Sequence, residues 1–442
     1  MLTSFQCYRE DVFQPLTVVN FSLMITVVIS PLLYLLFLQP AQIQKGLESV
    51  AFDLDALIKV MSLSLLAYVL TLIGYYAEAF IKLGKRAAYL LPNRFSLEKA
   101  LFKPDSRLGI LTFFCIIASA MLTVITSVKL DMTVPSLQKN ISGYDQMLEI
   151  LRQFSIFLLA LQLMKEYNNE KKFKALTVCI FFIALLLIGF VTKSKGLMVM
   201  PFLVLLLIPY YAGEKEFNIK FIAKCFGVLM ILIVLIYPAV NFLRRSARSQ
   251  DMLIPSSEKI IRTSYELFNR LSYLDELYIT FARPENAERF RANALTMGEQ
   301  FVWFLTPRLI ALDKPILTQG HLVGHYIFGY DLSGKFTSNA VVFYIGNCLL
   351  YHGFTGLFIM PVIFGFLFRF IYNFFILEQN LVLQTFYITS IKNIFALIEG
   401  ATFLGILSMG RTFIVFFSAI LVIGYLMGFG KLRYSPQRLT DT

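Results

Sequence analysis

Long apolar runs alternate with short polar stretches along most of this 442-residue chain. A helix needs about 20 apolar residues to cross a bilayer, and it satisfies its backbone hydrogen bonds within one segment, as lipid requires. The pattern therefore predicts an all-α polytopic membrane protein with about ten transmembrane helices. The expected spans are 15–38, 57–81, 108–128, 148–164, 175–192, 197–213, 225–243, 354–377, 381–408 and 412–430.

The longest polar stretch, 244–338, separates the seventh and eighth expected spans, and it holds 12 Lys and Arg and 10 Asp and Glu. Apolar residues recur at helical spacing within 256–280. Segment 339–351 is apolar but too short to span, which favours an interfacial or re-entrant helix. We expect three parts, namely spans one to seven in 1–243, a large loop in 244–353, and spans eight to ten with a tail in 354–442.

Lys and Arg are distributed unequally between the two sides that ten spans define. The short loops on the side of both termini carry 18 of these residues, and the short loops on the opposite side carry 6. In membrane proteins the cytoplasmic loops hold the excess of Lys and Arg. We therefore expect both termini in the cytoplasm and the large loop on the outer side of the membrane.

The composition agrees with a membrane protein and excludes several other classes. Hydrophobic residues make up 57% of the chain and charged residues 15%, against about 25% in soluble domains. A net charge of +12 would indicate a nucleic-acid partner in a soluble protein, but here we attribute it to the membrane and expect no nucleic acid. The five cysteines lack zinc-site spacing, so we expect no metal and no cofactor.

Several cations lie near span ends on the expected outer side, where Lys and Arg are disfavoured. If they meet in space, they form a pocket for a diphosphate at headgroup depth, because Arg binds phosphate oxygens in pairs and Lys adds charge. The alternative is that each extends to lipid headgroups as an anchor. The cations are Lys193 and Lys195 between spans five and six, Arg244, Arg245 and Arg248 after span seven, Arg308 in the large loop, and Arg411 in the expected turn 409–411.

Two further groups of ionisable residues are candidates for chemistry. His321, His325 and His352 are the three histidines of the chain, and histidine is the usual proton acceptor near neutral pH. A hydrogen-bonded structural role, or a metal pair of His321 with His325, remains open. Lys392 and Glu399 lie seven residues apart within the ninth expected span, which fits an internal ion pair or an ion path.

Four segments resemble the signature of the Wzy-type polysaccharide polymerases, which join O-antigen repeat units. The large loop contains MGEQ at 297–300 and TPRLIALDKP at 306–315, and YHGFTG follows at 351–356. Upstream, KSKG at 193–196 resembles a turn between two central spans of the family. Two positions depart from the family pattern, since Lys195 stands where Arg is common and Asn347 stands near a usual Glu.

This resemblance implies a GT-C-like glycosyltransferase of the bacterial inner membrane, with the large loop in the periplasm. Such an enzyme transfers a growing glycan from undecaprenyl diphosphate to a second lipid-linked oligosaccharide repeat unit, without a metal, and works with a chain-length regulator and a flippase. We expect the outer cations to bind the diphosphate. The residues assigned to it are Arg244, Arg245, Arg248 and Arg308, with Lys195 and Arg411 in support.

The acceptor hydroxyl needs a base within hydrogen-bond distance, and His321 or His325 is the expected one. Two other functions remain open at this stage. An O-antigen ligase uses the same donor with a different acceptor, and its pattern of charges would be the same. A transporter or flippase of lipid-linked saccharides would favour a charged central cavity, for which Lys392 and Glu399 are the indication.

Overall fold

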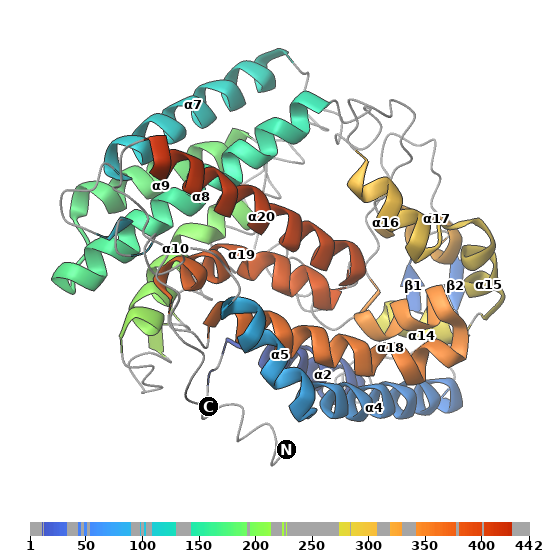
Figure 1. Cartoon of the computed structure of the whole chain (residues 1–442). Coiled ribbons are helices and arrows are strands. Elements are labelled where there is room, and N and C mark those ends of the chain that lie inside the picture. Colours follow the sequence, from blue (N-terminus) through green and yellow to red (C-terminus); the bar gives the residue numbers. More distant parts are fainter. Residues whose placement is uncertain are drawn as a thin grey trace.

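In the computed structural model the chain forms an assembly of packed helices (Figure 1). The structure describes residues 11, 13–32, 43–45, 48–50, 54–89, 98, 101–102, 108–129, 143–191, 195–213, 223–224, 227, 274–282, 284–306, 319–328, 342–376, 380–399 and 402–426. One short antiparallel hairpin, β1 (Ile43–Lys45) with β2 (Glu48–Val50), departs from the expected all-α class.

The N-terminal half of the described chain contains one composite helix followed by six others. They are α2 (Pro15–Leu23) continued by the π-helical η1 (Met24–Ile29), then α4 (Leu54–Tyr76), α5 (Glu78–Tyr89), α7 (Leu108–Lys129), α8 (Gly143–Glu170), α9 (Ala175–Val191) and α10 (Lys195–Ala212). The C-terminal half contains α14 (Leu274–Ala282), α15 (Pro284–Asn293), α16 (Met297–Leu305), α17 (Gln319–Phe328), α18 (Tyr344–Ile376), α19 (Leu381–Glu399) and α20 (Thr402–Leu426).

Five described helices are long and apolar enough to cross a membrane, so the chain is a multi-pass membrane protein. The five are Pro15–Leu32, Leu54–Tyr76, Met147–Glu170, Tyr344–Ile376 and Phe403–Ile423. Shorter apolar helices occupy Leu108–Thr123, Ala175–Gly189 and Leu197–Ala212, where the sequence also predicts spans. The seventh expected span, 225–243, lies largely outside the described residues, so the number of ten remains a prediction.

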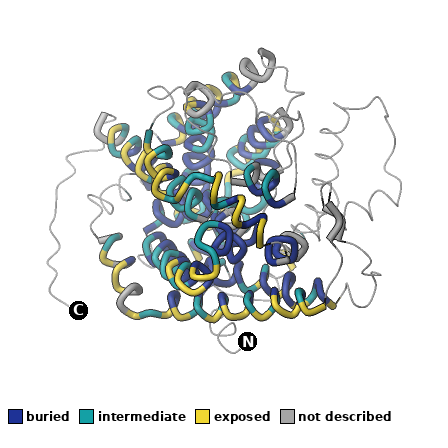
Figure 2. Tube along the Cα trace, turned by 90° about the vertical axis from the view of Figure 1, so that its right-hand side faces the viewer, coloured by how far each residue is buried: buried dark blue, intermediate teal, exposed yellow. Residues whose placement is uncertain are grey.

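Large apolar side chains cover the outside of the assembly. Phe114 of α7 is 66% exposed, Ile414 of α20 is 65% exposed, and Ile73 of α4 is 57% exposed. Figure 2 shows buried positions gathered inside the assembly and exposed ones along the outer faces of its helices. Contiguous apolar surface of this kind is rare on soluble monomers and is the surface that lipid tails cover.

Two glycines let α4 and α18 cross closely. A Cβ at Gly74 would overlap the carbonyl oxygen of Val362, and a Cβ at Gly365 would overlap that of Thr71. Each helix thus presents a glycine to the backbone of the other, as small residues do in membrane helix pairs, where close approach supplies the packing energy. The Oγ1 of Thr71 also lies 2.9 Å from the hydroxyl of Tyr344, so a hydrogen bond joins the pair beside the crossing.

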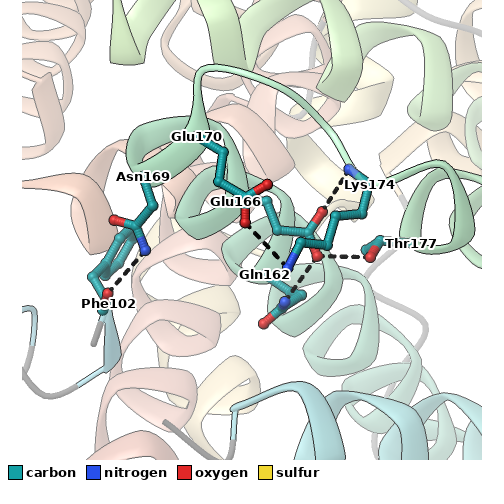
Figure 3. Close-up of polar contacts among 7 residues, drawn as sticks. All are labelled: Phe102, Gln162, Glu166, Asn169, Glu170, Lys174 and Thr177. Atoms are coloured by element: carbon teal, nitrogen blue, oxygen red, sulfur yellow. Dashed lines mark hydrogen bonds and ion pairs between the residues drawn. The ribbon is translucent and has the colours of Figure 1, made fainter. Parts of the chain in front are cut away.

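The connection from α8 to α9 is held by a buried glutamate. Glu166 is 4% exposed, and its carboxylate accepts hydrogen bonds from the Gln162 amide (2.9 Å), the Lys174 backbone N–H (3.1 Å) and the Thr177 hydroxyl (2.7 Å) (Figure 3). The last two donors belong to the start of α9, whose first N–H groups have no partner within the helix. Glu166 therefore fixes the angle at which the chain enters α9.

A buried acid joins the N-terminal segment to the helices. Asp11 is fully buried, and its carboxylate accepts hydrogen bonds from the hydroxyls of Tyr372 (2.9 Å) and Tyr210 (3.2 Å) and from the Phe13 backbone N–H (2.9 Å). Tyr387 donates to the Phe13 carbonyl oxygen at 2.7 Å. An ionised carboxylate is costly inside an apolar bundle unless donors surround it, so this network ties residues 11–13 to α10, α18 and α19.

The expected end of the ninth span is wrong. The sequence predicts spans 381–408 and 412–430 with a turn at 409–411, whereas α19 ends at Glu399 and α20 runs from Thr402 to Leu426. Arg411 therefore lies inside a helix and not in a turn. The prediction treated Arg411 as the polar interruption, but the interruption falls beside Glu399, and α20 accommodates the cation because the Phe304 ring receives it.

The segment before span eight agrees with expectation. The first part of α18, up to His352, is separated from the spanning part by Gly353, whose φ of 65° is in the left-handed region that glycine adopts easily. The Leu349 carbonyl oxygen, in the turn before the break, accepts a hydrogen bond from the Nη1–H of Arg291 on α15 at 3.0 Å. A short apolar helix followed by a full span is what 339–351 and 354–377 predicted.

We predict that Gly74→Ala and Gly365→Ala each destabilise the protein, because the new methyl group must push α4 and α18 apart. Overpacking of this kind costs about 1–3 kcal/mol, so the melting temperature in detergent should fall by several degrees. The matched control is Gly410→Ala in α20, where a Cβ meets nothing within 4 Å. Equal melting temperatures for all three variants would contradict the glycine crossing.

Candidate functional site

Four helices that pack on one another, α8, α10, α19 and α20, enclose a small polar cavity. The centre of a water molecule can occupy about 20 Å³ of this cavity, which is enough space for one water. Five of its described lining residues carry an amide or a hydroxyl, and the others are a lysine, a phenylalanine and three apolar residues. The lining residues are Gln153 and Ile156 of α8, Leu197 and Met200 of α10, Thr389, Ser390, Lys392 and Asn393 of α19, and Thr412 and Phe416 of α20.

Lys392 supplies the cation of this cavity. It lies seven residues before the end of α19, which is about 10 Å along the helix axis. No described residue forms an ion pair with Lys392, although the charges of Glu149 and Arg152 on α8 act on it. Ionisable groups inside membrane helices are expensive and face an internal space, a partner or a substrate. Lys392 faces the cavity, so it is the first candidate for binding an anion there.

The acidic and basic side chains on α8 lie next to the cavity. The Glu149 carboxylate forms an ion pair with the Arg152 guanidinium and accepts a hydrogen bond from the Gln153 amide at 2.8 Å. Arg152 is 15% exposed and Glu149 is 43% exposed, so the acid is the more accessible of the two. Both lie within the expected span 148–164, where their presence is itself a signal that the sequence analysis did not use.

Arg411 lies on α20 and is adjacent in sequence to a residue that lines the cavity. The next residue, Thr412, lines it, and the Arg411 guanidinium lies 4.6 Å from the centre of the Phe304 ring. Phe304 belongs to α16, which packs against α20. A cation over an aromatic face is stabilised without losing its charge, and Arg forms such contacts readily. Arg411 is exposed, and the contact stabilises its guanidinium against the Phe304 ring.

Helix α16 brings the large loop into this region. Its start is fixed by a capping box, in which the Thr296 hydroxyl accepts the Glu299 N–H (3.3 Å) and the Glu299 carboxylate accepts the Thr296 N–H (2.8 Å). Hydrogen bonds from Thr296 hold the pKa of Glu299 below its usual value. The helix ends at Leu305, three residues before Arg308 in the sequence. Arg308 itself lies outside the described residues.

Two segments of the family signature contact each other. The Gln300 amide donates to the Tyr351 hydroxyl at 3.0 Å, and the His352 Nε2 lies 3.3 Å from the Met297 sulfur. These pairs join the segments 297–300 and 351–356, which are more than 50 residues apart in the chain. The contacts place α16 against the broken start of α18, and α16 in turn holds Phe304 over Arg411.

The predicted diphosphate ligands are only partly described. Lys195 is the first residue of α10, two residues before Leu197 of the cavity, but its side chain lies outside the described residues. The remaining predicted ligands, Arg244, Arg245, Arg248 and Arg308, lie outside the described residues.

The predicted bases lie on a helix that contributes no described residue to the cavity lining. His321 and His325 are both in α17, which packs against α15 and not principally against the helices of the cavity. His325 is half-buried beside the Tyr326 ring, with 4.8 Å between ring centres, and the His321 side chain lies outside the described residues. The sequence analysis also missed the roles of Gln153 and Asn393, because amides within apolar helices give no distinctive spacing.

We predict a pH dependence for the order of α16. The pKa of Glu299 is depressed in the folded state, so its contribution is present above the pKa of the unfolded chain and is lost as the pH falls through the folded value. Hydrogen-exchange protection of α16, corrected for the intrinsic rate, should fall as the carboxylate is protonated. Glu299→Gln should remove this dependence. A pH-dependent loss that persists in the variant would contradict the role of the capping box.

Comparison of the chain with known protein families, with curated proteins and with solved structures gives no match. The functional argument therefore depends on the cavity, on the charges around it and on the sequence motifs.

Proposed function

We propose that this protein is a membrane glycosyltransferase that polymerises undecaprenyl-diphosphate-linked oligosaccharide repeat units at the periplasmic face of the bacterial inner membrane. One observation carries the proposal. Within the helical bundle, a small cavity is lined by Lys392 among residues of α8, α10, α19 and α20, and Arg411 is adjacent in sequence to the lining residue Thr412. A lipid whose headgroup carries a diphosphate fits a cationic site that lies among membrane helices.

The charge arrangement suits the chemistry of glycosyl transfer from a lipid diphosphate. As the bond from the sugar to the diphosphate breaks, negative charge develops on the leaving oxygen. Fixed cations in an environment of low dielectric stabilise that charge without reorganising. Lys392 and Arg411 are fixed on α19 and α20, and Lys195 stands at the start of α10. The leaving group is then stabilised by the protein's own cations.

The cavity is too small for a whole diphosphate and is the right size for a single hydroxyl group. Gln153, Asn393, Thr389 and Thr412 offer amide and hydroxyl groups, which both donate and accept hydrogen bonds as sugar hydroxyls do. We place the diphosphate at the mouth of the cavity, near Arg411, and a sugar hydroxyl within it. In this assignment Arg244, Arg245, Arg248 and Arg308 of the large loop complete the cationic site.

The distribution of charge also supports two other activities. A cavity lined by a lysine among membrane helices is what a transporter of lipid-linked saccharides would need. An O-antigen ligase would use the same donor and the same cations. We favour the polymerase because MGEQ and YHGFTG, which carry the resemblance, contact each other and position α16 beside Arg411.

The purified protein should be incubated with lipid-linked oligosaccharides extracted from cells that lack its gene. A ladder of products with increasing numbers of repeat units supports the polymerase. Transfer to lipid A core in place of a ladder identifies a ligase and overturns the proposal. Movement of the substrate across vesicles without any new glycosidic bond identifies a transporter and also overturns it.

We predict that Arg308→Ala abolishes long glycan chains in cells while the amount of protein stays unchanged, because a diphosphate ligand is lost. The measurement is the chain-length distribution on a gel, with an immunoblot for the protein. Chains of unchanged length would remove Arg308 from the site.

We predict that Lys392→Met lowers the rate of polymerisation by about 10²-fold or more, the effect of removing one group that stabilises developing charge. Lys392→Arg should retain part of the rate because it keeps the charge. The control is Lys172→Met in the exposed connection between α8 and α9, which should have no effect. A wild-type rate for Lys392→Met would separate the cavity from the reaction.

A further inference from the structure

The cavity has no acidic residue in its lining, although a transferred hydroxyl must lose a proton. The acid next to it is Glu149, whose carboxylate is one hydrogen bond away from the lining residue Gln153. Its negative charge also acts on Lys392 across the space between α8 and α19. A base must come within hydrogen-bond distance of the group that it deprotonates. Glu149 reaches the lining through Gln153, whereas α17 with its histidines contributes no described lining residue.

The carboxylate of Glu149 is held on one side and open on the other. Oε1 accepts the Gln153 amide at 2.8 Å, and Oε2 pairs with the Arg152 guanidinium. A carboxylate has about four lone-pair positions, so two partners leave room for a hydroxyl. The side chain is 43% exposed and can be reached. Glu166, further along α8, has the opposite arrangement, because it is buried and its carboxylate accepts three hydrogen bonds.

We infer that Glu149 is the base that receives the proton of the acceptor hydroxyl, and that Gln153 and Arg152 position its carboxylate. This inference depends on the proposed function. The acceptor oxygen forms a bond to the anomeric carbon of the donor sugar as its proton passes to Glu149. The bond from that carbon to the diphosphate oxygen breaks, and the electron pair leaves with the diphosphate. The diphosphate retains its negative charge beside Lys392 and Arg411.

A structural role would have different consequences. Glu149 with Arg152 is an ion pair of neighbouring helical turns, and such pairs also occur on solvated helix ends. The same helix contains a matched example, because Glu170 pairs with Lys174 at 3.2 Å near its other end. Replacing Glu by Gln keeps the size and the hydrogen-bond acceptor but removes the base. Glu149→Gln and Glu170→Gln therefore compare the two roles on one helix.

The test uses the full-length protein, lipid-linked oligosaccharides from cells that lack the gene, and undecaprenyl diphosphate without sugar as a binding probe. We expect Glu149→Gln to lower kcat by about 10²-fold or more, the range for general base catalysis, and to bind undecaprenyl diphosphate within twofold of the wild type. Glu170→Gln should keep the wild-type kcat. Formate should restore part of the activity of Glu149→Ala.

The pH profile distinguishes the base from its neighbours. Among the described residues, Arg152 on α8 pairs with Glu149, and Lys392 on α19 interacts with its charge. The wild-type rate should fall on the acid side as the base is protonated, and Glu149→Gln should lack this fall.

Three results would overturn the assignment of Glu149 and leave the polymerase intact. These are a wild-type kcat for Glu149→Gln, an acid-side fall that persists in the slow variant, and a parallel loss of undecaprenyl diphosphate binding. If the wild-type protein forms no ladder, the proposed function itself fails, and the role of Glu149 fails with it.

Discussion

The cost of placing charge inside an apolar helical bundle is the constraint on which this structure depends. Each charged or polar group among the described helices needs a partner, since lipid offers none. Asp11 accepts hydrogen bonds from two tyrosine hydroxyls, and Arg291 donates to the Leu349 carbonyl oxygen near the break at Gly353. Arg411 lies over the Phe304 ring. Lys392 is the exception among these, because it faces a cavity and forms no ion pair with a described residue.

The difference between a satisfied and an unsatisfied charge separates the structural sites from the functional one. The carboxylate of Asp11 joins the N-terminal segment to α10, α18 and α19. It accepts hydrogen bonds from a backbone N–H and two tyrosine hydroxyls. Glu166 has the same character at the start of α9. Such networks rigidify the bundle, and their polar groups already have hydrogen-bond partners that a ligand would otherwise supply. The cavity beside Lys392 has the opposite character, since it holds polar groups and an empty space next to a cation.

Periodicity and composition were sufficient to predict most of the helices. Apolar runs identified α4, α7, α8, α9, α10 and α18, with ends that differ from the predicted ones by at most about ten residues. The segment before span eight was recognised as a separate helix because it is too short to cross a membrane. The last two spans were divided at the wrong residue. Hydropathy alone cannot tell a charge that ends a helix from one that a neighbouring side chain accommodates, and the ring that receives Arg411 lies on α16, about 100 residues upstream.

The candidate site was only partly predictable for a related reason. Charge near span ends pointed to Lys195 and Arg411, each within two residues of a lining position in the sequence, and intramembrane charge pointed to Lys392, which lines the cavity. Glu149 and Arg152 were not singled out, because the segment 148–164 is predominantly apolar and was interpreted only as one membrane span. Which helix faces the cavity is decided by packing between distant segments. The pattern of residues within either segment does not predict that α8 and α19 pack against each other.

The most direct test of the account is photo-crosslinking with an undecaprenyl diphosphate that carries a diazirine on its first isoprene unit, followed by peptide mapping. The account predicts labelled peptides from α8, α19 and α20 near Lys392 and Arg411, and competition by unlabelled undecaprenyl diphosphate but not by undecaprenol. Labelling that is confined to the Asp11 end of the bundle, or that undecaprenol competes away equally well, would contradict it.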